Sequence, residues 1–170
     1  MPVAGIDLDG VTFTPVSPQL ATVKLTVSAI LHLILLAVAC VPLALTLAGP
    51  WAGMWTWAAW APPVVVLALW VLDLVLIPRR VRSMGWAERE DDLLWRQGVL
   101  FRSVQAVPYG RLQYVDASDG PLLRRHGLQT LTLKTASSGA DVELEGLPAE
   151  TCDRLREVLL ARGQARLAGL

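Results

Sequence analysis

Two long apolar stretches constrain the fold of this chain more than any other feature of its sequence. The first, Leu25–Ala48, contains His32 as its one ionisable group apart from a thiol, and the second, Met54–Ile77, contains only Asp73. Each stretch has the ~20 apolar residues that a helix needs to cross a bilayer. The uncharged link "GPWAG" between them is so short that the two helices have to run antiparallel. The sequence therefore predicts a transmembrane helical hairpin.

Charged residues are concentrated in the remainder of the chain. Of the 15 Lys+Arg and 15 Asp+Glu, 14 and 12 respectively follow Pro78. Lys24 precedes the first apolar stretch, and Arg79, Arg80 and Arg82 follow the second. Because positive residues accumulate on the cytoplasmic side, we expect a multi-pass protein of the cell membrane with both termini in the cytoplasm and these four residues at the lipid headgroups. An aromatic belt then marks the opposite interface: Trp51, Trp55, Trp57 and Trp60.

Four segments follow from these patterns. Residues 1–23 form a loose lead-in, 24–78 the hairpin, 79–165 a cytoplasmic domain and 166–170 a short tail. The first apolar stretch is too long, and starts too late, for the apolar region of a signal peptide. Pro62–Pro63 leaves two arrangements of the second helix open, because the helix either kinks there or has its membrane-spanning part begin there.

After Arg82 the apolar residues recur with a period of two, which is typical of half-buried strands. The stretch "LLWRQGVLFRSVQAV" predicts two strands joined at Gln97–Gly98, and "RLQYVD" predicts a third. In "TLTLKT" and "DVELEGL" apolar residues alternate with polar ones, so both stretches predict strands with one dry face. The "ASSG" between them predicts a turn. The sequence thus predicts an antiparallel meander.

The C-terminal region predicts a helix over Pro148–Arg162 that ends at Gly163. Cys152, Leu155 and Leu159 share one face of this helix. A helix with one apolar stripe, after a meander with one dry face, needs to bury the two surfaces against each other. We therefore expect an α+β fold in which the C-terminal helix closes a bent antiparallel sheet or partial barrel.

Neither cysteine of the chain indicates a disulfide or a metal centre. Cys40 lies in the first apolar stretch, and Cys152 follows more than a hundred residues later. The sequence has no Cys-x-x-Cys motif and no cluster of cysteine and histidine. Both residues are therefore interpreted as structural thiols, and we expect no metal and no other cofactor.

The stretch "RLQYVDASDGPLLRRHGL" (Arg111–Leu128) has the residue types of a catalytic loop, a docking surface or a corner of a fold. A catalytic or metal site would combine His126 with Ser118, Asp116 or Asp119. A histidine without further partners is weak support for catalysis, and the chain has no glycine-rich phosphate loop. We therefore expect that the protein is not an enzyme.

As a corner of a fold, the same stretch has ordinary turn chemistry. Asp119–Gly120–Pro121 turns the chain, Leu122 and Leu123 enter the core, and Gly127 allows the next strand to begin. The basic residues then stay at the surface. They form a candidate partner surface, which consists of Arg111, Arg124, Arg125 and His126.

Three motifs give the chain a family resemblance. They are "P-x-x-R-[LI]-Q" at Pro108–Gln113, "D-x-x-x-G-P-L-x-R-x-x-G-L" at Asp116–Leu128 and "GLPAE" at Gly146–Glu150. Together with the two apolar stretches, these motifs make residues 25–162 similar to the bacterial YdbS-like family (bacterial PH type 2). Members of this family are membrane proteins with a pleckstrin-homology-like (PH-like) domain.

The resemblance implies a PH-like fold that acts as a protein-interaction module. Many eukaryotic domains of this fold bind phosphoinositides through basic residues of the first hairpin, but the corresponding hairpin here carries the acidic "EREDD" (Glu88–Asp92). The family has short and long members, which implies a complex with a larger PH-domain membrane protein, or a homo-oligomer. Membrane lipids are the other expected partner, and nucleic acid is not expected. The chain departs from the family pattern at Tyr114 and His126.

Two alternatives to the interaction module stay open. One is a sensor of anionic lipid, and the other is a solute or proton pathway built from several copies of the hairpin. The second would depend on polar groups inside the membrane, and only His32 and Asp73 supply them in the two apolar stretches.

His32 and Asp73 are expected at nearly the same depth. His32 lies 19 residues before Trp51, at the centre of the link, and Asp73 lies 22 residues after it. The two therefore differ by about one helical turn at most. Ionisable residues inside a membrane are costly and have partners. One hypothesis is a direct hydrogen bond between them; another pairs Asp73 with Arg80 and turns His32 to a different chain; a proton relay is the third.

Overall fold

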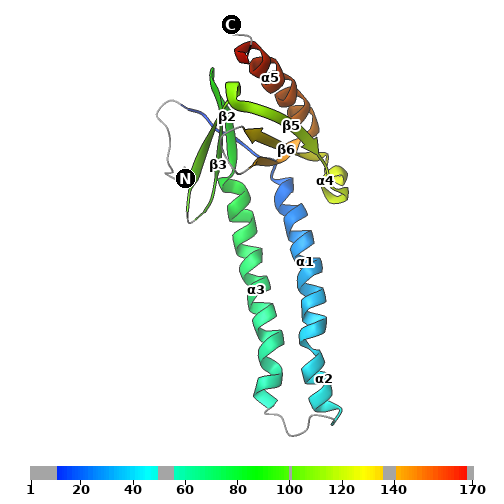
Figure 1. Cartoon of the computed structure of the whole chain (residues 1–170). Coiled ribbons are helices and arrows are strands. Elements are labelled where there is room, and N and C mark those ends of the chain that lie inside the picture. Colours follow the sequence, from blue (N-terminus) through cyan, green and yellow to red (C-terminus); the bar gives the residue numbers. More distant parts are fainter. Residues whose placement is uncertain (1–10, 50–55, 100, 136–140, 168–170) are drawn as a thin grey trace. The chain divides into compact units, whose positions relative to one another are not determined.

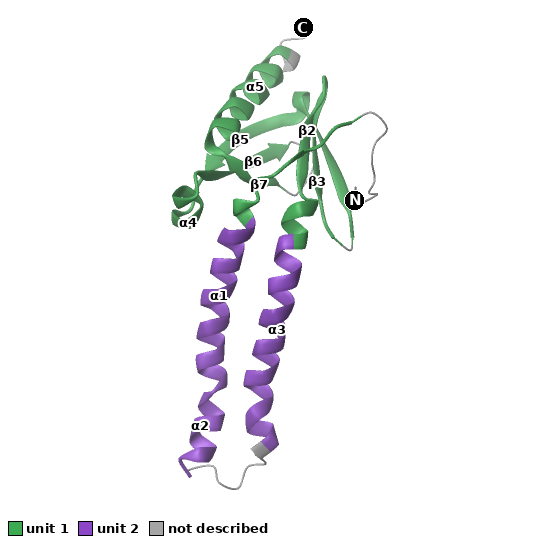
Figure 2. Ribbon diagram, turned by 180° about the vertical axis from the view of Figure 1, so that it is seen from behind, with its two compact units in different colours: residues 1–20, 79–170 green, residues 21–78 purple. Residues whose placement is uncertain are grey.

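The computed structural model of the protein describes residues 11–49, 56–99, 101–135 and 141–167. The chain divides into two compact units, which Figure 2 colours separately. We call Ala21–Pro78 the helical unit. The remainder, Met1–Leu20 together with Arg79–Leu170, is called the sheet unit.

Two apolar helical segments account for the helical unit (Figure 1). Helix α1 (Gln19–Ala39) is followed by the shorter α2 (Val41–Leu47), and α3 (Thr56–Ser83) forms the second segment. By length and composition, Gln19–Leu47 and Trp57–Ser83 are able to cross a membrane, with mean hydropathies of 2.6 and 2.2. These are the two apolar helices expected from the sequence.

Prolines affect the two segments differently. Helix α1 ends at Ala39 because Pro42, in the first turn of α2, has no N–H for a continuous helix and its ring crowds the carbonyl four residues earlier. By contrast, Pro62 and Pro63 lie inside α3, which already begins at Thr56. Helix α3 therefore runs through both prolines, and the start of its membrane-spanning part stays a prediction.

The sheet unit contains two antiparallel sheets with the strand orders β1-β2-β3-β4 and β5-β6-β7. Their strands are β1 (Thr14–Pro15), β2 (Gly85–Glu88), β3 (Asp92–Gln97), β4 (Ser103–Pro108), β5 (Leu112–Ser118), β6 (Leu128–Thr135) and β7 (Val142–Pro148). The five strands expected from the period-two pattern are β3 to β7, and all are confirmed. The short β1 and β2 have too few residues for a recognisable period. The expected turn at "ASSG" lies outside the described residues.

Helix α5 (Ala149–Leu167) packs on the second sheet, alongside β5 and β6 in Figure 1. Its apolar stripe of Cys152, Leu155 and Leu159 is at most 1% exposed. The sheet contributes residues that are equally buried, namely Leu131, Leu133 and Leu144. Full burial of one leucine side chain stabilises a fold by about 1.5–3 kcal/mol. The expected α+β class with a C-terminal helix is therefore confirmed, with its strands divided between two sheets.

The prediction that this helix ends at Arg162–Gly163 is wrong, because α5 continues to Leu167. Gly163 is buried against η1 (Tyr109–Arg111), and a Cβ built on it would lie 3.5 Å from the backbone oxygen of Tyr109. Such a Cβ would make an ordinary van der Waals contact, and Gly163 does not end the helix.

The N-terminal segment belongs to the sheet unit. Strand β1 pairs with β2, and the Ser17 N–H donates to the backbone oxygen of Gly146 at 3.1 Å. Val16 and Leu20 are buried. Where the sequence suggested a loose lead-in, residues 14–20 thus contribute a strand and two core side chains.

Gly146 is where this segment meets β7. The register of β6 and β7 shifts between Gln129 and Leu131, and β7 has one residue more there, which defines a β-bulge. Gly146 has a φ of +75°, and a Cβ at this position would lie 2.6 Å from Leu20 Cδ2. Both the backbone conformation and the close approach of Leu20 require glycine.

Three glycine-to-alanine substitutions separate these two requirements. Gly120→Ala should be nearly neutral, because φ is −89° and the space is open. Gly127 has a φ of +64° and open space around it, so Gly127→Ala should lower the free energy of unfolding by ~1–2 kcal/mol through backbone strain alone. Gly146→Ala should lower it by a further ~1–3 kcal/mol, because the new Cβ also displaces Leu20. Chemical denaturation of the full chain in detergent measures all three; equal effects at Gly127 and Gly146 would contradict the contact with Leu20.

Burial of Cys152 makes the stability of the sheet unit dependent on alkaline pH. Burial raises the pKa of the Cys152 thiol from 9.0 to about 11, so the folded state keeps a proton that the unfolded chain loses. The burial of the neutral thiol contributes fully to the free energy of unfolding below pH 9. This contribution is lost as pH rises toward 11, at ~1.4 kcal/mol per pH unit. Denaturation at a series of pH values should show this decline in the wild type, and Cys152→Ala should reduce its slope. An unchanged slope would show that the thiol ionises equally well in the fold.

Candidate functional site

Burial in the helical unit is the reverse of that in a soluble protein. Ser28 and His32 are each 7% exposed, whereas Leu31 and Leu33 are 53% and 55% exposed. A bilayer suits such an outer surface, and polar groups inside a bilayer need partners within the protein. The polar cluster between α1 and α3 is therefore the first candidate site.

The cluster is assembled from one face of each helix. Ser28 and His32 are four residues apart on α1, and Trp70 and Asp73 are three apart on α3, so each pair shares a face. The Ser28 hydroxyl donates to Asp73 Oδ2 at 2.7 Å and lies 3.2 Å from His32 Nδ1. His32 Nδ1 is also 2.9 Å from the backbone oxygen of Ser28. Ser28 therefore bridges the imidazole and the carboxylate.

His32 and Asp73 lie at the same level, as counting from the link predicts. Their closest atoms, Nδ1 and Oδ2, are 4.0 Å apart, which is too long for a hydrogen bond. The direct hydrogen bond is therefore not the contact observed, because Ser28 lies between the two side chains and donates to the carboxylate. The sequence reasoning missed Ser28; the signal that identifies it is a hydroxyl one helical turn before a histidine in an apolar helix.

Trp70 was also missed, and it covers the histidine. Its ring stacks on the imidazole with the centroids 6.3 Å apart and the planes at 10°. Within the described part of the chain, the buried Trp70 Nε1 has no hydrogen-bond partner. The His32 side chain is 9% exposed and that of Asp73 is 41% exposed. The imidazole is thus enclosed, whereas the carboxylate reaches the surface of the helical unit.

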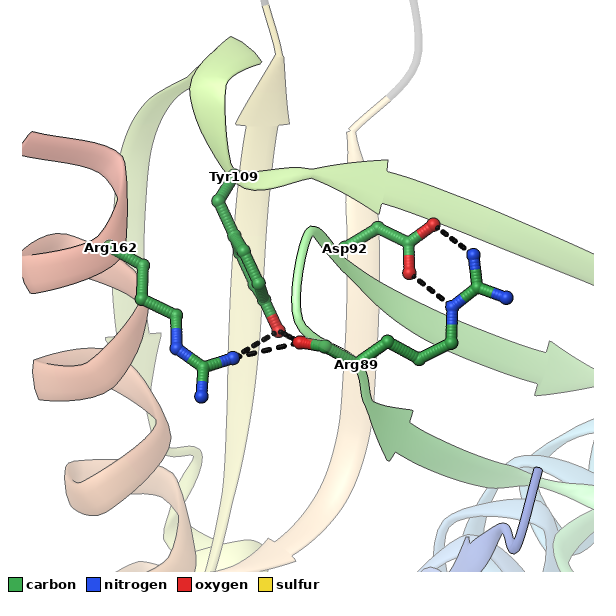
Figure 3. Close-up of polar contacts among 4 residues, drawn as sticks. All are labelled: Arg89, Asp92, Tyr109 and Arg162. Carbon is green, nitrogen blue, oxygen red and sulfur yellow. Dashed lines mark hydrogen bonds and ion pairs between the residues drawn. The ribbon is translucent and has the colours of Figure 1, made fainter. Parts of the chain in front are cut away.

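The turn between β2 and β3 is the second candidate, and Figure 3 shows how it is held. The Arg89 guanidinium binds both oxygens of Asp92, at 2.7 and 2.8 Å. Arg162 of α5 donates to the backbone oxygen of Arg89 at 2.8 Å and to Tyr109 Oη at 3.1 Å. Tyr109 Oη in turn donates to the same backbone oxygen at 3.0 Å. Helix α5 therefore fixes the shape of this turn.

The electrostatics of the turn favour cations over anions. The hydrogen bond with Asp92 raises the pKa of the Arg89 side chain, and burial raises the pKa of Tyr109, which keeps the phenol protonated as a donor. Arg154 of α5 is engaged by Glu88 at 2.6 Å. Four acidic residues accompany Arg89 in the turn: Glu88, Glu90, Asp91 and Asp92. Such a surface repels an anionic headgroup.

The corner before β6 contains the short helix α4 (Pro121–Arg125). Arg124 binds Asp119 at 2.6 Å, and this hydrogen bond lowers the pKa of Asp119. The expectation that Leu122 and Leu123 enter the core is wrong: both are only half-buried, because a single helical turn stands out from the sheet. The corner is thus a structural element fastened by one ion pair.

The basic residues of the expected partner surface lie on two elements: Arg124, Arg125 and His126 at α4, and Arg111 in η1. Arg125 is exposed at the end of α4. The backbone N–H of the next residue, His126, donates to the backbone oxygen of Leu123 at 3.0 Å. Arg111 lies in η1, on the connection from β4 to β5, and has an interaction of its own. The sequence grouped residues that the fold assigns to separate elements.

The topology residues lie near the N-terminal end of α1 and at the C-terminal end of α3. Lys24 is half-buried on α1 and has an interaction of its own. Arg79, Arg80 and Arg82 are exposed in the last two turns of α3. Cations there interact favourably with the C-terminal end of the helix dipole.

Strand β4 gives the first sheet an open edge. It pairs with β3, and as the last strand in the sheet order it has no second partner strand among the described residues. Its sequence, "SVQAVP", is uncharged, and Ser103, Gln105 and Ala106 are exposed. Phe101, just before the strand, is 92% exposed. Neither feature was singled out in the sequence, because exposure of a strand edge depends on the final strand order.

The described residues offer no group of three or more His, Cys, Asp or Glu that could hold a metal ion. Residues 18–163, which span both units, match the family "Bacterial PH domain". The chain belongs to this family. The expected family is therefore confirmed.

A curated relative agrees with this assignment. The chain is 33% identical over 108 residues to the transmembrane protein YdbS of Bacillus subtilis (strain 168). The match covers 59% of this chain and 65% of that protein's length. No solved structure matches the chain. With its two apolar helices, the chain is a YdbS-like membrane protein with a bacterial PH domain.

Proposed function

We propose that the PH domain of this membrane protein is an assembly module that binds a second membrane protein with a PH domain. The observation that carries the proposal is the open edge of β4 next to the exposed Phe101. An unpaired edge strand offers a row of backbone donors and acceptors to another chain. Addition of a strand to such an edge, with an aromatic anchor beside it, is a common mode of protein recognition.

The composition of the edge supports this role. Natural edge strands are protected from unwanted pairing by charges, prolines or covering elements. Strand β4 has no charge, and its one proline, Pro108, stands at the end. An edge that is left open in this way is suited to a specific partner. The basic corner with Arg125 is the secondary contact in the same proposal.

An anionic lipid is a weaker candidate for the ligand of this domain. The arginines nearest the β2–β3 turn are already engaged, Arg89 by Asp92 and Arg154 by Glu88. The acidic residues of the turn would have to be brought close to a phosphate. The engaged arginines and the acidic turn thus favour a protein partner. In this proposal the domain has neither an enzymatic role nor a cofactor.

We further propose that α5 closes the two sheets into a partial barrel. The helix packs on β5, β6 and β7, and its Arg162 and Arg154 reach Arg89 and Glu88 at the turn of the first sheet. One helix therefore contacts elements of both sheets, as a closing helix must.

The proposed topology has two membrane crossings and cytoplasmic termini. Strand β1 precedes the apolar helices and β2 follows them, yet the two strands pair. Both flanks of the hairpin therefore lie on one side of the membrane, and the basic residues Arg79, Arg80 and Arg82 favour the cytoplasmic side.

A photo-crosslinking amino acid at position 101 tests the assembly role. In cells, it should yield an adduct with another membrane protein that has a PH domain, and the same amino acid at the exposed Leu160 of α5 should not. Ala106→Lys should reduce the yield about tenfold, because a 1.4 kcal/mol penalty at the edge corresponds to that factor. Ala161→Lys, the same change on exposed α5, serves as the control. Adducts with lipid alone would refute the proposal.

Thiol labelling tests the topology independently. In a variant without Cys40 and Cys152, an impermeant reagent added to intact cells should label a cysteine placed at Gly49. A cysteine at Ala161 should react only after the membrane is opened. Labelling of Ala161→Cys in intact cells would show that the orientation is the opposite of the one proposed, and it would leave the assembly role untouched.

A further inference from the structure

The hydrogen bonds of the membrane cluster fix the positions of two protons. The backbone oxygen of Ser28 only accepts, so His32 Nδ1, 2.9 Å away, carries the hydrogen between them. The single hydroxyl hydrogen of Ser28 is directed to Asp73 Oδ2 at 2.7 Å. Nδ1 then also donates toward Ser28 Oγ at 3.2 Å. All donors therefore point from the imidazole to the carboxyl group of Asp73, which accepts at Oδ2.

An ionised carboxylate at this position needs a compensating charge. A lone charge in an apolar environment is unfavourable, and it is either paired or neutralised by a proton. His32 Nδ1 lies 4.0 Å from Asp73, and a second proton on Nε2 makes the pair neutral overall.

The other ionisable groups of the two helices are farther away. In residues 11–49 and 56–78 they are Lys24, four residues before Ser28, and Cys40, eight residues after His32. Along α3 the next is Arg79, six residues after Asp73. At ~1.5 Å per residue, these separations are about 6, 12 and 9 Å along the helix axes. His32 Nδ1, 4.0 Å from Asp73 Oδ2, lies within ion-pairing distance of the carboxylate.

We propose that Ser28, His32 and Asp73 form a proton-binding site that holds one proton between the imidazole and the carboxylate. In one form, the imidazolium donates through Ser28 to the carboxylate. In the other, the Nδ1–H bond has broken as an O–H bond formed on Ser28, and the original O–H bond of Ser28 has broken as an O–H bond formed on Asp73. Both forms are neutral overall, and no electron is transferred.

The two ends of this site differ in access. The Asp73 side chain is 41% exposed and that of His32 is 9% exposed. Asp73 is therefore the open end of the site, and His32 is its enclosed end. This site is separate from the strand edge of the assembly module and is tested separately.

The chain has two histidines, which makes ¹⁵N-histidine NMR of the full-length protein in lipid nanodiscs a direct test. His126, in the sheet unit, is the internal reference. At neutral pH, the ring signals of His32 should lie between those of charged and neutral imidazole, averaged by proton transfer. Asp73→Asn should move them to the neutral position, because the compensating charge is lost. Neutral-ring signals in both proteins would overturn the proposal.

Substitutions of Ser28 test the relay itself. Ser28→Ala should slow the proton transfer about tenfold or more, which corresponds to 1.36 kcal/mol or more in the barrier, and separate signals for the two forms should appear. Ser28→Thr keeps a hydroxyl and should restore the averaged signals. Thr26→Ala removes an exposed hydroxyl that donates to Thr22 O and should change nothing. Averaged signals in Ser28→Ala, with His126 unchanged as proof of folding, would refute the role of Ser28.

Discussion

Burial of one face of α5 is the interaction on which the sheet unit depends most. The apolar stripe of the helix covers the second sheet, and polar side chains on another part of its surface reach the first. Arg162 bonds to the backbone oxygen of Arg89 and to Tyr109 Oη, so the same helix also anchors the turn between β2 and β3.

Local pattern made much of this fold predictable. Strands β3 to β7 each have several residues in alternation, and the stripe of α5 repeats over two turns, so both are visible in a single sequence. Strand β1 has two residues and no pattern. Gly163 predicts a helix end because glycine is a common stop signal, yet α5 continues through it to Leu167. Ser28 was missed because a hydroxyl in an apolar helix acquires its meaning from the carboxylate on the facing helix.

In both units, the place of unsatisfied polar groups is decided by whether the surroundings are apolar or aqueous. In the helical unit the apolar surface is outside, so hydrogen bonds are collected inside, between Ser28, His32 and Asp73. In the sheet unit the apolar side chains are inside, and unmet backbone hydrogen bonds are left at the edge of β4. A group without a partner is costly where water is excluded and inexpensive where water is present. The polar cluster is therefore closed within one chain, whereas the strand edge is available to another.

The pairing of β1 with β2 imposes an order on biosynthesis. The ribosome delivers Thr14 before the two apolar helices, and its partner Trp86 only after them. The N-terminal segment therefore has no strand partner until both apolar helices have been synthesised. The first sheet can be completed only after the whole stretch from Gln19 to Ser83 has been made.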